Sequence, residues 1–136
     1  MSATTVERVE LSRFLTLTGR RFERGDTAPE MFSGAVDAEW HRLLDDPDYP
    51  AFCAKTAGQL VLHAAINGAG PVSWVSEYEA AFGCVLPDIW FTDAEGNLDT
   101  VAVARYRDTG EVLGEWNCSP TGGDGDDVVP SRKRNR

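Results

Sequence analysis

Four residues between positions 37 and 63 carry side chains that can do chemistry: Asp37, His41, Cys53 and His63. They include both histidines of the chain and one of its three cysteines. Asp37 and His41 are four residues apart, so on a helix they share one face and the carboxylate can orient the imidazole. Such a pair is typical of acid–base sites and of the groups around a bound metal ion.

Cysteine and histidine are ligands that zinc and copper prefer, so His41 and Cys53 are the candidate metal ligands. If two helices meet at a tight turn through Asp46-Pro47-Asp48, both side chains lie at comparable distances from that turn. His63 lies further along and would face the start of the earlier helix. The alternative is structural, with His41 bonded to Asp37 at the edge of the core and Cys53 as a small buried side chain. If these residues are structural, we expect no cofactor. If they bind a metal ion, we expect zinc or another transition metal.

Length, charge and cysteine content limit the number of domains and the kinds of partner to be expected. A chain of 136 residues predicts a single domain. Its net charge of −9 disfavours binding to phosphate backbones, because that affinity comes from Lys and Arg. No long apolar run or signal-like N-terminus is present, so we expect no membrane contact and a cytoplasmic location. The three cysteines form no C-x-x-C pair and are expected to be reduced thiols.

Apolar residues at helical spacing predict a mainly α fold, a compact bundle of about four helices. The expected helices cover residues 6–23, 27–44, 48–66 and 72–82. The second is expected to start at a capping box formed by Thr27 and Glu30.

A short extended or mixed segment follows the bundle. Residues 89–91 are expected to be extended. Residues 98–107 suit either a helix, capped by Asp99 and followed by Gly110, or a strand paired with residues 112–116, and we favour the helix. The single helical domain is expected to end at residue 118, and residues 119–136 to form a disordered tail with an acidic part and a basic tip.

Two further stretches could bind something. Trp116 beside the tail, together with Arg132, Lys133 and Arg134 in the basic tip, could contact a partner, although a solvated tail is the simpler interpretation. Residues 93–99 alternate oxygen-bearing side chains as a calcium loop does. Their glycine stands at the fourth place instead of the sixth, so a solvated turn explains the stretch better.

The motifs Val36-Asp37-x-x-Trp40-His41 and Tyr49-x-x-Phe52-Cys53, with Gly58 and His63 beyond them, resemble the glycine-rich domain protein family of plants and bacteria. The resemblance covers about residues 30 to 66, and the rest of the chain looks like a small stand-alone actinobacterial version. Leu43 and Leu62 stand where family members often carry histidine. The resemblance implies a helical domain and no particular reaction.

Two functional classes remain. The absence of a complete catalytic motif and the acidic charge favour a non-catalytic cytosolic binding or accessory protein that acts through a protein partner. The alternative is a small metal-assisted enzyme that uses Asp37, His41 and Cys53, with His63 as an outlying candidate. Nucleic-acid binding through the basic tip is a third, less favoured possibility.

Overall fold

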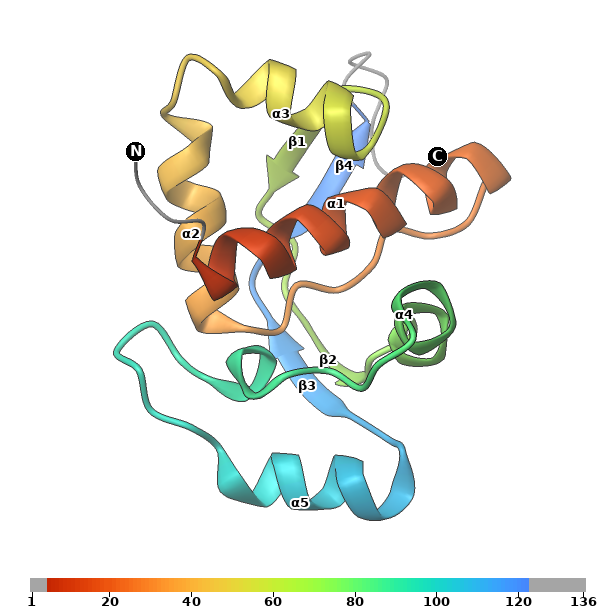
Figure 1. Cartoon of the computed structure of the whole chain (residues 1–136), viewed down its shortest axis with the longest axis vertical. Helices are drawn as coiled ribbons and strands as arrows, with labels where there is room; N and C mark the ends of the chain where they lie inside the picture. Colours follow the sequence, from red (N-terminus) through yellow and green to blue (C-terminus); the bar gives the residue numbers. More distant parts are fainter. Residues whose placement is uncertain (1–4, 123–136) are drawn as a thin grey trace.

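The computed structural model describes residues 5–122, so the expected basic tip with Arg132, Lys133 and Arg134 lies outside the described residues. The architecture is mixed α/β, and the prediction of a helical bundle is only partly confirmed (Figure 1). Residues 5–122 form five α-helices, one 3-10 helix and four short strands: α1 (Val6–Arg24), α2 (Gly34–Leu44), α3 (Tyr49–Thr56), β1 (Val61–Ala64), β2 (Gly68–Pro71), α4 (Val75–Phe82), η1 (Asp88–Phe91), α5 (Thr100–Thr109), β3 (Leu113–Trp116) and β4 (Ser119–Gly122).

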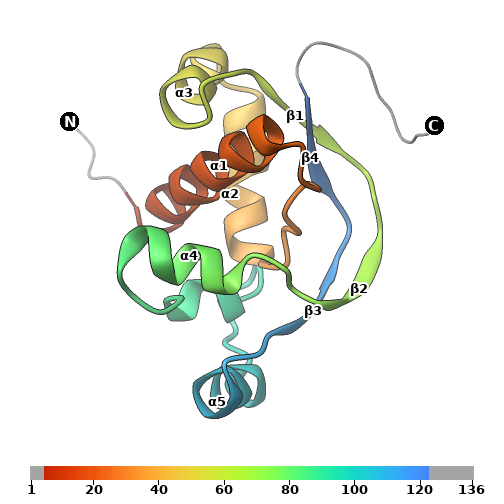
Figure 2. The ribbon, with the colours of Figure 1, turned by 90° about the vertical axis from the view of Figure 1, so that its right-hand side faces the viewer.

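The strands form one long antiparallel ribbon. β1 pairs with β4 and β2 pairs with β3. Because β1 and β2 are consecutive in the chain, as are β3 and β4, the two pairs follow each other, and Figure 2 shows the ribbon curving along one side of the helices. Ala64 pairs with Ser119 and Gly68 with Trp116, so residues 65–67 face only residues 117–118. The segment between β1 and β2 is thus one residue longer than the segment between β3 and β4, which makes a bulge-like step in the ribbon.

The third expected helix was too long. α3 ends at Thr56, and Gly58 has a φ of +79°, a left-handed conformation that ends a helix. The chain then enters β1, which pairs with β4. Since β4 is Ser119–Gly122, the folded part also extends four residues beyond the expected domain end at residue 118.

The first and last helices were predicted correctly. In α1 the Thr5 side chain caps the first turn by accepting a hydrogen bond from the Arg8 backbone at 3.0 Å. In α5 the Asp99 side chain accepts from the Ala102 backbone, also at 3.0 Å, and Gly110 closes the helix with a φ of +78°. Both helices are delimited by local capping residues, which is why the sequence was sufficient.

The expected capping box at residues 27–30 was wrong. α2 begins only at Gly34, and its cap is Ser33. The Thr27 carbonyl accepts a hydrogen bond from Arg21, and the Glu30 carboxylate accepts one from the Ser73 backbone at 3.0 Å. Thr27 therefore binds the end of α1, and Glu30 joins two segments that are 43 residues apart, so neither residue caps α2. The expected extended segment at residues 89–91 is likewise wrong, since it lies in η1.

An aromatic core holds the helices together. The Phe14 ring of α1 lies 5.9 Å from Trp40 of α2, 5.6 Å from Trp74 before α4 and 5.8 Å from Trp90 of η1. All four side chains are fully buried. Their packing fixes the rotation of α2 about its axis, because Trp40 must face inward.

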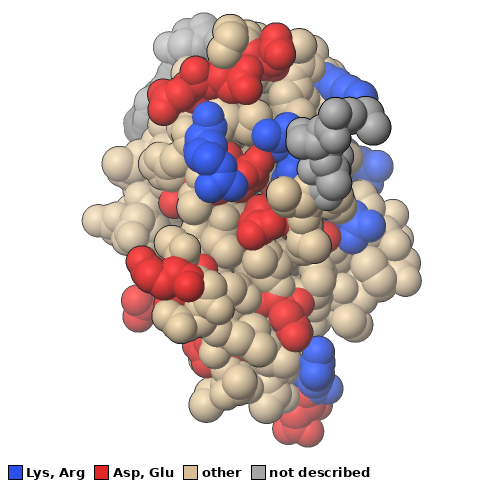
Figure 3. All heavy atoms as spheres, turned by 60° about the vertical axis from the view of Figure 1, so that its left-hand side comes forward, with Lys and Arg blue, Asp and Glu red and all other residues tan. Residues whose placement is uncertain are grey.

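One face of the molecule shows how the charged side chains are distributed over the described residues. On the face drawn in Figure 3, acidic side chains are interspersed with basic ones, and no broad basic area is formed by the described residues there. Trp116 is half-buried, and its indole lies against Gly68 of the paired strand. Within the described part of the chain, no helix has the length and apolar character needed to cross a membrane.

Candidate metal site

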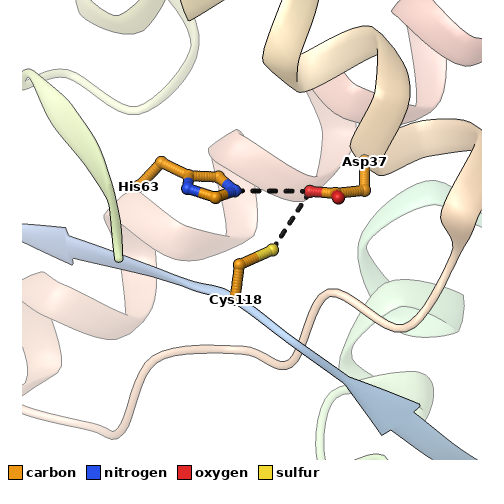
Figure 4. Close-up of side chains that lie close together, drawn as sticks. All are labelled: Asp37, His63 and Cys118. Carbon is orange, nitrogen blue, oxygen red and sulfur yellow. Dashed lines mark hydrogen bonds and ion pairs between the residues drawn. The ribbon is translucent and has the colours of Figure 1, made fainter. Parts of the chain in front are cut away.

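Three side chains with different metal-ligating atoms converge beside α2. The Cys118 thiol donates to Asp37 Oδ1 over 3.0 Å, and His63 Nε2 lies 3.4 Å from the same oxygen (Figure 4). One ligand atom from each residue lies within 4.8 Å of the other two. The three residues come from α2, from β1 and from the join between β3 and β4.

The ribbon register explains why His63 and Cys118 meet. His63 is directly opposite Pro120 in the β1–β4 pair. Cys118 is two residues before Pro120, so its side chain lies on the same face and is the diagonal neighbour of His63. The ribbon thus supplies an imidazole and a thiol side by side, and α2 adds the Asp37 carboxylate.

A buried relay ties β1 to α2. The Trp40 indole N–H donates to the Tyr49 hydroxyl over 2.9 Å, and that hydroxyl donates to the Val61 carbonyl over 2.6 Å. Burial raises the pKa of Tyr49, so its hydroxyl stays protonated as the second donor requires. The Trp40 ring also packs against the His63 ring with centroids 4.6 Å apart. His63 is therefore held in place from the core side.

His41 lies at the open side of the cluster. It follows Asp37 by one helical turn, and its Nε2 lies 3.3 Å from Asp37 Oδ2. Its ring is 4.4 Å from the His63 ring, measured between centroids. The His41 side chain is 56% exposed, against 15% for His63. A small molecule would therefore reach the cluster past His41.

The cluster is poorly satisfied as it stands. His63 Nε2 is buried and has no hydrogen-bond partner, the only such side-chain atom in the described part of the chain. Burial, and then the neighbouring Asp37, raise the pKa of the Cys118 thiol. A neutral thiol and an unpartnered imidazole nitrogen beside one carboxylate are the donor set that a divalent cation would complete, because it would draw the proton from the thiol and fill the missing contact.

The same observations argue against a cysteine nucleophile. A reactive thiolate needs a cation or a general base beside the sulfur to lower its pKa. Here the group that touches the Cys118 sulfur is the Asp37 carboxylate, which acts in the opposite direction. The arrangement therefore differs from a Cys–His–Asp triad, in which the imidazole stands between the thiol and the carboxylate.

The distances fit a tetrahedral zinc ion. Two ligand atoms bound to one zinc ion at about 2.0–2.3 Å lie roughly 3.3–3.7 Å apart. The contacts of Asp37 Oδ1 are 3.0 Å to Cys118 and 3.4 Å to His63, and no pair exceeds 4.8 Å. Side-chain shifts of about 1 Å would therefore bring all three atoms onto one ion. The fourth place would be left for His41 or for water.

The structure separates Cys53 from the other candidates. Its sulfur lies 4.0 Å from the Val61 carbonyl, its side chain is fully buried in the core, and it is not part of the ligand cluster. Asp37, His41 and His63 do come together, as the contacts above describe. The expected ligand pair of His41 and Cys53 is therefore replaced by one in which Cys118 supplies the sulfur. His41 and Cys53 were paired because they lie at comparable distances from a turn. That reasoning failed because the face of α3 that carries Cys53 packs against β1.

Sequence analysis missed Cys118 as a site residue. The signal that could have found it is the strand pairing, since pairing residues 61–64 with 119–122 makes Cys118 the diagonal neighbour of His63. That pairing was hidden because residues 57–66 were expected to be helical.

The loop with calcium-like spacing is a closed turn. Asp93 Oδ1 accepts from the backbone of Glu95 at 3.0 Å and of Asn97 at 2.8 Å. The Asn97 backbone bond is the main cause of the lowered pKa of Asp93. Asp99 caps α5. The side-chain oxygens of Asp93 and Asp99 thus have structural partners, which agrees with the expected turn.

Neither a protein-family model, nor a curated protein, nor a solved structure matches this chain. The resemblance to glycine-rich domain proteins stays a prediction. Function is therefore argued from the geometry of the site.

Proposed function

We propose that this protein binds one zinc ion through Asp37, His63 and Cys118, with His41 or a water molecule at the fourth place. The observation that carries the proposal is the convergence of three ligand types from three separate elements around the buried, unpartnered His63 Nε2. Zinc is the preferred ion because a set of one thiol, one imidazole and one carboxylate is of intermediate softness.

The role best supported by this site is metal-assisted chemistry. If His41 does not fill the fourth place, a zinc ion held by Asp37, His63 and Cys118 would keep one place open, and it would acidify a water molecule bound there. The 56% exposure of His41 supports access from solvent on that side. The metal-assisted enzyme predicted as the alternative is thus supported with Cys118 in place of Cys53, whereas the accessory role stays a prediction without a specific contact in its favour.

A cytoplasmic location is part of this proposal. Cys53, Cys84 and Cys118 are all free thiols in the structure. A zinc site that depends on the Cys118 thiolate requires a compartment that keeps thiols reduced, such as the cytoplasm.

The test is metal analysis with a matched cysteine control. Untagged protein purified without chelator should contain about one equivalent of zinc by inductively coupled plasma mass spectrometry. His63→Ala and Cys118→Ala should each lower zinc affinity at least about 100-fold in isothermal titration, because each removes a direct ligand. Cys53→Ala removes a buried thiol outside the cluster and should keep wild-type affinity.

Cobalt gives a second readout. Co²⁺ in the same place should show the intense visible absorption of a tetrahedral site and a sulfur-to-metal charge-transfer band that disappears in Cys118→Ala. A protein that takes up no stoichiometric metal, or one in which Cys53→Ala and Cys118→Ala lose metal equally, would refute the proposal.

A further inference from the structure

A groove of about 770 Å³ opens away from the metal ligands, between the β2–β3 part of the ribbon, η1, the turn at residues 93–99 and the start of α5. None of Asp37, His41, His63 and Cys118 lines it. Its volume falls in the range of small-molecule sites, about 300–1,000 Å³. It is thus a hollow separate from the ligand cluster, with a size suited to one small ligand.

Apolar side chains form much of the groove. The rings of Phe32 and Phe91 lie 5.9 Å apart and both line it. Leu98 and Leu113 also line it and are 41% and 47% exposed, which places them among the most exposed large apolar residues of the described chain. A ligand with an apolar body would remove these two leucines from water.

Every ionisable side chain that lines the groove is acidic. The three are Asp93, Asp99 and Glu115, and no Lys, Arg or His contributes to the walls. Glu115 comes from β3, whereas Asp93 and Asp99 belong to the turn before α5, so acidic residues enter the lining from two separate segments. Such an arrangement repels anions and attracts a cation.

Two glycines, Gly70 and Gly114, shape the ribbon wall of the groove. At Gly114 of β3 an added Cβ would lie 2.9 Å from Phe32 Cβ, so only glycine lets the ribbon lie this close to the aromatic ring. Gly70 of β2 has a φ of +141°, which disfavours any side chain, and an added Cβ there would meet nothing within 4 Å. The wall at Gly70 is therefore bare backbone next to open space.

We propose that this groove binds a small organic cation, an amine or a guanidine carried on an apolar body. The apolar part would lie against Phe32, Phe91 and the two leucines, and the cationic group would face Glu115 and the aspartates. Aromatic faces beside the cation add attraction of their own. The inference does not rest on metal binding, because the groove and the zinc ligands share no residue.

The probes are 2-phenylethylamine and its uncharged counterpart 2-phenylethanol, titrated into the full chain at low salt and followed by two-dimensional NMR. The amine should bind at least about 10-fold more tightly than the alcohol and shift resonances of residues that line the groove. Raising the salt concentration should weaken the amine alone, because the carboxylates are exposed and screened.

Matched variants locate the charge that matters. Glu115→Gln and Asp99→Asn should each weaken amine binding several-fold, and asparagine keeps the oxygen that caps α5. Asp108→Asn, which changes an exposed carboxylate of α5 outside the groove, should leave binding unchanged. His63→Ala should also leave it unchanged, which separates this test from that of the zinc site.

Three results would overturn the inference: equal affinity for amine and alcohol, no binding of the amine, or binding of a basic peptide such as tetra-arginine without binding of the amine.

Discussion

Two carboxylates lie at the centre of polar clusters in this fold, and their surroundings differ in kind. Glu10 of α1 is 3% exposed, and its oxygens accept from the Tyr78 hydroxyl at 2.7 Å, the Trp90 indole at 2.9 Å and Arg13 at 3.3 Å. Asp37 of α2 instead touches a thiol of raised pKa and two imidazoles, one with its nitrogen unpartnered.

The first cluster is complete and the second is not. Glu10 has neutral donors and one cation, as a buried carboxylate needs when it joins elements of the core. The groups around Asp37 are of types that bind metal ions, and one of them, His63 Nε2, has no hydrogen-bond partner. Both clusters contain polar and ionisable side chains, and what distinguishes the Asp37 cluster is a ligand-type nitrogen, His63 Nε2, that has no hydrogen-bond partner.

The largest expected difference between the clusters is in stability without metal. Glu10→Ala should lower the free energy of unfolding by about 3–5 kcal/mol, because it leaves two buried donors, the Tyr78 hydroxyl and the Trp90 indole N–H, without their acceptor. Asp37→Ala should cost less than about 1 kcal/mol, since its contacts are partly exposed and poorly matched. Urea denaturation in the presence of EDTA measures both, and Glu10→Gln serves as a milder variant if Glu10→Ala does not fold. If Glu10→Ala and Asp37→Ala lowered the free energy of unfolding equally, the two clusters would not differ in their contribution to stability.

Added zinc should stabilise the protein through the Asp37 cluster and not through the Glu10 cluster. At a free zinc concentration 100-fold above the dissociation constant, the free energy of unfolding of the wild-type protein should rise by about 2.7 kcal/mol. The gain should persist in Cys84→Ser, which removes an exposed thiol, and should vanish in His63→Ala. Thermal unfolding with and without zinc measures it. A gain that survives in His63→Ala would place the ion elsewhere.

A smaller effect should appear when one donor is removed from the complete cluster. Tyr78→Phe takes away the hydroxyl that donates to Glu10 and accepts from Arg13 at 2.8 Å. The free energy of unfolding should fall by about 1–2 kcal/mol, because Glu10 keeps its indole donor. Chemical denaturation measures the loss, and zinc affinity should not change. A parallel fall in zinc affinity would mean that the two clusters are coupled.

His41→Ala should have the smallest effect. Its exposed side chain should contribute within about 0.5 kcal/mol to stability without metal. If His41 orients Asp37 or occupies the fourth place only weakly, zinc affinity should fall about 10-fold, by isothermal titration. A fall as large as that of His63→Ala would make His41 a full ligand.

Local signals explain which parts of the fold could be predicted. α1 and α5 are capped by Thr5 and Asp99. Each cap accepts a hydrogen bond from the backbone three residues later, so a short stretch of sequence is enough to predict where the helix begins. β1 depends on pairing with β4, near the other end of the described chain, and helical periodicity does not register such a partner. The start of α2 was predicted too early for the same reason, because Glu30 binds Ser73, a residue far away in the chain.

The candidate site divides in the same way. Asp37 and His41 could be paired from their four-residue spacing, and His63 could be named from its type. Cys118 could not be assigned without the strand register, and Cys53 was chosen because it and His41 lie at comparable distances from the turn at residues 46–48. Contact across the ribbon, set by one pair of strands, decided between the two cysteines.

The position of Cys118 also sets when the site can exist. It contacts Asp37 across 81 residues of chain, so the ligands assemble only after the last strand has left the ribosome and paired with β1. A chain still being synthesised, or one truncated before residue 118, holds an imidazole and a carboxylate but no sulfur ligand. Metal uptake by the proposed site would therefore require that β4 has paired with β1.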